Sequence, residues 1–303
     1  MLLRDKITKI FFDFDEYLKI NFPNIDNSFS LTNSLEMSFS EIGAIAIAYH
    51  QSTHKCFKYY YQEEILTNHI SYFPSAVSYE RFVSIQQRVL PFLIAFLKDT
   101  RLCSPTIANY IDASKLEVCH LMRVPSNKVF KGQAKYGRTI MGRFYGYKFH
   151  LIINHLGQIV NVIFSKGNVA DNNKKLLREI TENFIGLLIG DKGYITSIRE
   201  ELLENGINLV TKPRKNMKPI KHIAEVEYYK KHRGLIETTN GLLKEKANIQ
   251  HTRHRSTANF ELNLWASIIA YTYNDKLPSI KTYQKPVKPI CPIAVAMELQ
   301  MAA

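Results

Sequence analysis

The 303-residue chain contains only four cysteines and lacks any long run of apolar residues. The cysteines form no CxxC pair and no short-spaced cluster with histidine, so we expect reduced thiols and no zinc site. No apolar run approaches the roughly 18 residues that are needed to span a bilayer. The opening sequence carries acids where a signal peptide has an apolar core. We therefore expect a cytoplasmic protein with no membrane partner.

Acidic residues are also scarce, and the deficit lies beyond residue 100. The chain has 40 Lys and Arg residues against 27 Asp and Glu residues, a formal net charge of +13. Residues 1–100 carry a net charge of −2, so the remaining residues carry +15. This asymmetry favours a polyanionic partner, most simply nucleic acid. A basic surface without any ligand would give the same count.

The length and the pattern of the sequence indicate two domains and a tail. Residues 1–104 have helical patterns, among them the apolar stretch at 41–49 and a helix that Ser78 is placed to cap. This smaller all-α N-terminal domain suits a DNA-binding helix-turn-helix module, and it suits a packing or dimerisation bundle equally well. Residues 281–303 are interrupted by proline and lysine, and the sequence assigns them no role.

Residues 105–280 combine strands with helices. Strands are expected at 106–119, 145–154, 158–165, 187–189 and 207–210. Asp171 is expected to cap a helix at 172–184, and Ser197 with Glu200 makes a capping box for the next helix. The order predicts an α/β fold, with a mixed sheet that is flanked by helices.

Three acidic residues have positions that are typical of a catalytic site. Asp112 lies within the first predicted strand, Asp191 directly follows an apolar strand, and Glu237 lies in a predicted helix. An acid in an apolar strand is costly unless it is paired or binds a metal, and open α/β sheets have their sites at strand ends. Carboxylate oxygens suit Mg²⁺ or Mn²⁺, and two such ions can catalyse phosphoryl transfer.

Basic residues near these acids are candidates for DNA binding. Arg233 and Lys244 share one helical face with Glu237, although an ordinary surface ion pair explains the Arg233–Glu237 spacing as well. Lys148 and His150 alternate onto one face of a strand, where they contact DNA or simply satisfy the sheet. The other candidates lie in two basic loops: Lys212, Arg214, Lys215 and Lys218 in the first, Arg253 and Arg255 in the second.

At these residues the chain resembles the DDE transposases of bacterial insertion sequences, and most closely the insertion sequence 982 group. The resemblance covers roughly residues 35–280. It rests on several short segments that occur in the same order: Ile111–Ser114, Gly146–His150, Gly167–Asp171, Gly190–Tyr194, Arg233–Lys244 and His251–Ser256.

The resemblance implies an RNase H-like catalytic domain in which Asp112, Asp191 and Glu237 bind two Mg²⁺ ions, with Mn²⁺ as a possible substitute. It implies cleavage of the element's ends and transfer of the 3′-hydroxyl to target DNA. Because two ends must be brought together, a homodimer is expected. The family's tyrosine position falls on Lys230, with Tyr229 one residue early. A nuclease without strand transfer and a silent DNA-binding descendant are the alternatives.

Overall fold

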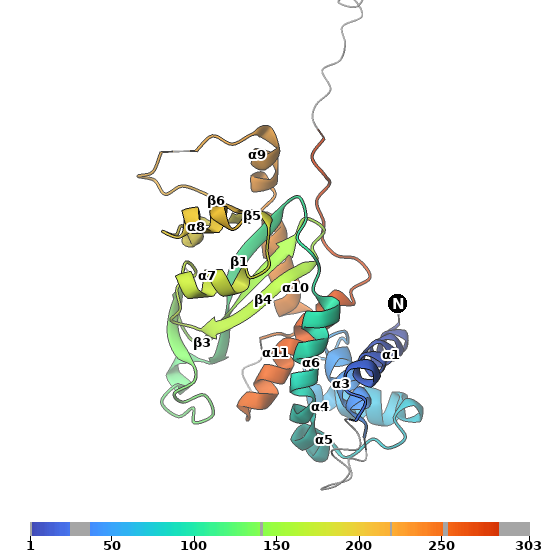
Figure 1. Ribbon diagram of the computed structural model, residues 1–303. Helices are drawn as coiled ribbons and strands as arrows, with labels where there is room; N and C mark the ends of the chain where they lie inside the picture. Colours follow the sequence, from blue (N-terminus) through green and yellow to red (C-terminus); the bar gives the residue numbers. More distant parts are fainter. Residues whose placement is uncertain (1, 25–36, 140–141, 219, 251–253, 285–303) are drawn as a thin grey trace, which may run out of the picture.

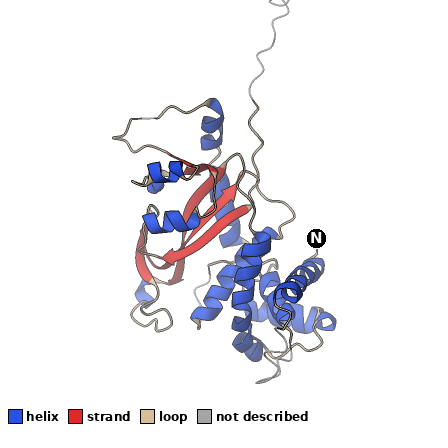
Figure 2. Ribbon diagram, viewed as in Figure 1, coloured by secondary structure: helices blue, strands red, loops and turns tan. Residues whose placement is uncertain are grey.

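The computed structural model describes residues 2–24, 37–139, 142–218, 220–250 and 254–284 (Figure 1). A group of helices from the first hundred residues packs beside a sheet that is covered by further helices (Figures 1 and 2). No helix among the described residues is long and apolar enough to cross a membrane. Three cysteines lie in the described part, and all three are free thiols.

The N-terminal region is helical, as predicted. Its α-helices are α1 (Leu3–Asn21), α3 (Phe39–Tyr49), α4 (Phe57–Tyr59), α5 (Tyr79–Ile85) and α6 (Leu90–Phe96). Short π- or 3₁₀-helical segments continue them: η1 (Tyr60–Asn68), η2 (Ile70–Tyr72), η3 (Gln86–Val89) and η4 (Leu97–Arg101). Ser78 caps α5 by accepting the backbone N–H of Arg81, which confirms that prediction. Ser38 and Glu41 form a capping box at the start of α3.

The sheet has six strands. They are β1 (Asn109–Cys119), β2 (Lys135–Thr139), β3 (Gly142–Asn154), β4 (Ile159–Lys166), β5 (Gly186–Gly190) and β6 (Ile207–Thr211). Their order is β2-β3-β1-β5-β6, and β4 also pairs with β3. β3 is antiparallel to β1 and β4, whereas β1, β5 and β6 run parallel. This mixed sheet has the RNase H-like arrangement that was expected.

Helices cover both faces of the sheet (Figure 2). α7 (Lys174–Ile180) and α8 (Arg199–Glu204) pack with the side chains of Ile111 and Ile152 on one face. α10 (Gly234–Glu245) lies against β1 on the other face and contacts α11 (Thr257–Thr272). The remaining elements are the short 3₁₀ turns η5 (Leu121–Arg123) and η6 (Lys192–Tyr194) and the helix α9 (Ala224–Lys231).

Two predicted helix caps are wrong. α7 begins after Asn173, whose side chain accepts the backbone N–H of Leu176, so Asp171 lies outside the helix. α8 begins after Ile198 without any side-chain cap, so Ser197 does not form the expected capping box. In the first case the carboxylate of Asp171 is engaged by Lys148. A long-range ion pair has therefore displaced the cap that local sequence favours.

One apolar core connects the N-terminal helices to the sheet. It contains buried residues of α1, α3, α5 and α6 together with buried residues of β1, β3, α10 and α11. α11 is the link, because the six consecutive residues 266–271 are all buried. A helix that is buried on all sides must be surrounded by other elements. Trp265 is partly buried against this core and packs edge-on against Phe164, at 5.0 Å between ring centroids.

Candidate active site

Asp112 and Asp191 are brought together by the pairing of two parallel strands. β1 and β5 pair in register at Tyr110 and Ile189, and each acid lies two residues further along its strand. Neighbouring strands are about 4.8 Å apart, so the two acids lie side by side. Asp191 follows the last residue of β5, at the strand end where open α/β sheets have their sites.

Arg233 connects Asp112 to the third predicted acid, Glu237. The guanidinium of Arg233, which precedes α10, lies 3.9 Å from Oδ1 of Asp112. It also donates a hydrogen bond to the Glu237 carboxylate, one turn further along the helix. The side chain of Arg233 is only 18% exposed, whereas that of Glu237 is 59% exposed. The arginine therefore lies inside the acidic site rather than on its outer surface.

Asn240 is a site residue that the sequence analysis missed. Its Nδ2 donates a hydrogen bond of 2.9 Å to Oδ2 of Asp112, which fixes that carboxylate against α10. Its Oδ1 is buried and accepts no hydrogen bond from the described residues. The spacing of positions 233, 237, 240 and 244 is 4, 3 and 4 residues, which defines one helical face. This helical spacing is the feature of the sequence that could have identified Asn240 as a site residue.

The site holds Asp112 in an electrostatically unfavourable position. Burial is the largest effect, and it raises the pKa of Asp112 from 3.8 to about 6. Arg233 opposes this shift, while the neighbouring charges of Asp191 and Glu237 raise the pKa further. A carboxylate with this pKa gains from any additional positive charge in the site. Such perturbed acids are characteristic of functional sites.

A fourth acid, Asp171, lies beside the site. Its Oδ1 accepts from Nζ of Lys148 at 2.8 Å, and the same ammonium bonds the carbonyl of Val169. A side chain on Gly193 would meet the carboxylates of both Asp191, at 2.8 Å, and Asp171, at 3.7 Å. Gly193 therefore leaves room for the carboxylate of Asp191, and both acids lie next to it. Asp171, which the sequence predicted to be a helix cap, therefore lies next to the acids instead.

Lys148 and His150 lie inside the protein. Lys148 is 8% exposed and is held by Asp171, and His150 is completely buried with a 2.8 Å hydrogen bond between its Nε2 and Ser165. Burial lowers the pKa of His150 to about 4, so the imidazole is neutral. Of the two interpretations of this pair, these contacts favour the one in which both side chains satisfy polar groups of the sheet.

A comparison with known protein families shows which family this chain belongs to. The family model described as a transposase DDE domain matches residues 102–257, which is more than half of the 303 residues. The chain is a member of the DDE transposase family. It is therefore an enzyme of a polynucleotidyl transferase family, and its domain serves DNA transposition. The comparisons found no matching curated protein and no matching solved structure.

The acids of this transposase do not form a preassembled metal site. Among the described residues, no group of three His, Cys, Asp or Glu side chains is arranged to hold a metal ion. The guanidinium of Arg233 contacts two of the acids and supplies the positive charge between them. The donors themselves fit a hard divalent cation of the kind that DDE transposases use, since all are oxygens. The buried Oδ1 of Asn240, which lacks a hydrogen-bond donor, supports that fit.

The other predicted DNA-binding residues lie around the site or outside the described residues. The four predicted DNA-binding residues Lys212, Arg214, Lys215 and Lys218 are all exposed on the loop that follows β6. Lys244 shares one helical face with Glu237, and burial lowers the pKa of Lys244. Arg255 is exposed next to α11, whereas Arg253 lies outside the described residues. Tyr229, one residue before the family's tyrosine position, is a fully buried core residue.

Proposed function

We propose that the chain is a transposase of the insertion sequence 982 group that cleaves the ends of its element and joins the freed 3′-hydroxyl to target DNA. The observation that carries the proposal is the position of Asp112: Arg233 lies next to it and pairs with Glu237, and the charges of Asp191 and Glu237 both act on its carboxyl group. The match to a transposase DDE domain covers all three acids.

In this proposal Asp112, Asp191 and Glu237 hold two Mg²⁺ ions, which Mn²⁺ can replace. When bound, the ions supply activation of the attacking hydroxyl and stabilisation of the leaving oxygen. Asn240 orients the Asp112 carboxylate through its Nδ2 hydrogen bond. Arg233, already next to two of the acids, balances negative charge that the scissile phosphate adds to the site.

The substrate of the proposed reaction is double-stranded DNA. Lys244 and the exposed cations of the 212–218 loop neutralise its phosphates, and Arg253 and Arg255 are proposed to do so from the second basic loop. The N-terminal helices serve end recognition or dimerisation. The reaction joins two element ends to one target, which makes a homodimer the expected working unit. Its site of action is the cytoplasm, where bacterial DNA lies.

The test is a cleavage and strand-transfer assay with Mg²⁺ on DNA that carries the gene's own flanking ends. Asp191 is the residue to change, because it is partly exposed at a strand end and its loss does not open a cavity. Asp191→Asn should lower the rate more than about 100-fold, since even outer partners of metal ligands cost 10–100-fold. DNA binding should stay intact or become stronger, because a negative charge near phosphate is removed.

Asp5→Asn on the exposed face of α1 is the matched control, with the same loss of charge far from the acids along the chain. Joined products from the wild type and from this control, but not from Asp191→Asn, support the proposal. Cutting without joining would favour a nuclease. Binding without any chemistry in the wild type would favour a silent DNA-binding descendant.

A further inference from the structure

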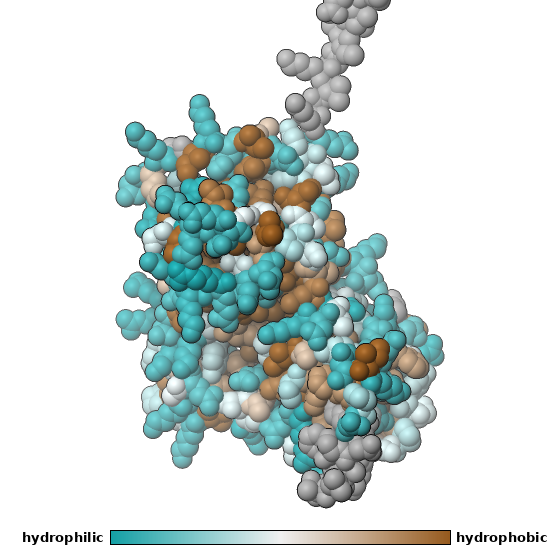
Figure 3. All heavy atoms as spheres, in the orientation of Figure 1, coloured by the Kyte–Doolittle hydropathy of each residue, from teal (hydrophilic) through white to brown (hydrophobic). Residues whose placement is uncertain are grey.

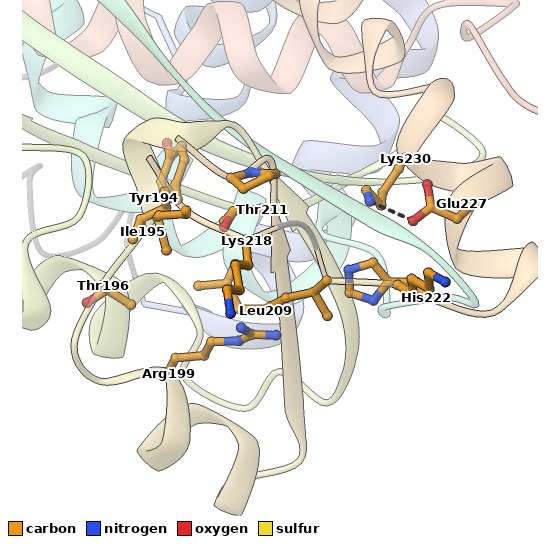
Figure 4. A pocket seen from close by; sticks show the side chains of 14 residues that line it. Tyr194, Ile195, Thr196, Arg199, Leu209, Thr211, Lys218, His222, Glu227 and Lys230 are labelled. Carbon is orange, nitrogen blue, oxygen red and sulfur yellow. Dashed lines mark hydrogen bonds and ion pairs between the residues drawn. The ribbon is translucent and has the colours of Figure 1, made fainter. Parts of the chain in front are cut away.

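A hollow of about 570 Å³ lies beside the acidic site, on the side of β6. It is enclosed by η6, α8, the end of β6, the loop that follows β6, and α9 (Figure 4). Tyr194 forms part of its wall, and this tyrosine comes three residues after Asp191. The negative charges of Asp112, Asp171 and Asp191 raise the pKa of Tyr194 further above the level set by burial. The hollow and the acids therefore share Tyr194 as a common wall.

The lining of the hollow combines apolar and cationic side chains. Its apolar members include Leu209, Met217 and Ile220, and the last two are 45% and 53% exposed although they sit in a basic loop. Brown, apolar atoms accordingly appear among hydrophilic ones over the region of α8 and α9 (Figure 3).

The cationic members of the lining come from three elements: Arg199 from α8, Lys218 and Lys221 from the loop, and Lys230 from α9. Arg199 and Lys218 both line the hollow (Figure 4). The one acid of the lining, Glu227, is neutralised by Lys230 at 2.8 Å. The hollow is therefore strongly positive at its edge.

We infer that this hollow receives one unpaired nucleotide of the DNA substrate, with the base against the apolar side chains and its phosphates on the cations. The inference rests on the proposed function, because it takes DNA as the substrate. A duplex backbone presents only phosphates and sugars, which cations on an open surface would bind equally well. Exposed Met217 and Ile220 in a concave, basic site instead match the apolar faces of an unstacked base.

The experiment compares the binding of the full chain to two labelled duplexes, which are identical except for a single unpaired adenine in one of them. Wild-type protein should bind the bulged duplex roughly tenfold more tightly, as expected when a base is buried on apolar groups. Fluorescence of 2-aminopurine at the bulge should change when the protein binds. Ile220→Asn and Met217→Gln, which alter exposed side chains without changing charge, should abolish the preference and retain duplex binding.

Ile223→Asn is the matched control, because Ile223 is 69% exposed near the same loop and does not line the hollow. This variant should keep the wild-type preference. Equal affinity of the wild type for both duplexes would overturn the inference while leaving the proposed function intact. A preference that survives in Ile220→Asn and Met217→Gln would also overturn it. Failure to bind either duplex would overturn the proposed function, and the inference with it.

Discussion

At the scale of single residues, the folded protein destabilises the ionised form of Asp112. Its carboxyl group is mostly buried, beside two other acids, and its pKa is raised to about 6 from an ordinary value of 3.8. A raised pKa in the folded state means that the native protein binds this proton more tightly than the unfolded chain does. The resulting stabilisation is present below pH 4 and is lost as the pH rises through about 6.

Asp112→Asn should therefore stabilise the metal-free protein at pH 8 while abolishing catalysis. The amide mimics the protonated carboxyl, so the gain approaches about 3 kcal/mol, from roughly two pKa units at 1.4 kcal/mol each. Below pH 4 the variant and the wild type should have equal stability. Urea unfolding at pH 8 and pH 4 with EDTA measures this, with Asp5→Asn as the surface control. A variant less stable than the wild type at pH 8 would contradict the conclusion that the ionised carboxylate of Asp112 destabilises the folded protein.

The three acids were predictable because each one lies in a recognisable local sequence pattern. The residues that contact the acids were not predictable in this way. An acid within or directly after an apolar strand is visible in the sequence, and so is the helical spacing of Arg233 and Glu237. The contact between Lys148 and Asp171 joins residues 23 apart, and the one between Asn240 and Asp112 joins residues 128 apart. Such contacts depend on how the sheet and α10 pack, which no local pattern specifies.

At the scale of elements, strands were predicted better than helix starts. β5 and β6 are short apolar runs between polar segments, and burial leaves them few alternatives. At α7 the predicted cap was wrong because asparagine and aspartate compete for the same role within a few residues, whereas α8 begins without any side-chain cap. At α7 the cap is Asn173, while Asp171 forms an ion pair with Lys148 of β3. The start of a helix is thus set partly by tertiary contacts.

The loop after β6 is the element on which phosphate binding can be tested. Charge reversal of the exposed residues Lys215 and Lys218 to glutamate should weaken binding to all DNA sequences. It should also lower the slope of log K against log salt by about 1 for each lost phosphate contact. The same change at exposed Lys9 and Lys98, within the slightly acidic residues 1–100, keeps the total charge equal. If both pairs weaken binding equally in a titration from 50 to about 200 mM salt, the loop is only a solvated connector.

At the scale of the whole molecule, α11 makes the two regions dependent on one another. α11 is hydrogen-bonded to the N-terminal region. Arg101 donates to the hydroxyl and the carbonyl of Thr272 in α11, and Asn259 of α11 donates to the carbonyl of Val83. On its other side the hydroxyl of Tyr271 donates to the carbonyl of Gly157, in the turn between β3 and β4. A boundary near residue 104 thus separates two sequence patterns that share one apolar core.

The catalytic segment alone, residues 102–284, should therefore fail to fold. Without the N-terminal helices, several buried side chains of α11 become exposed, at about 1.5–3 kcal/mol each. This loss is comparable to the 5–15 kcal/mol that stabilises a typical protein. Near-UV circular dichroism and urea unfolding of the segment, next to the full chain, measure the effect. Phe12→Ser, a change at a 64% exposed position of α1 in the full chain, is the control and should unfold like the wild type. A cooperative transition of the isolated segment at the wild-type midpoint would show that α11 needs only the sheet for its burial.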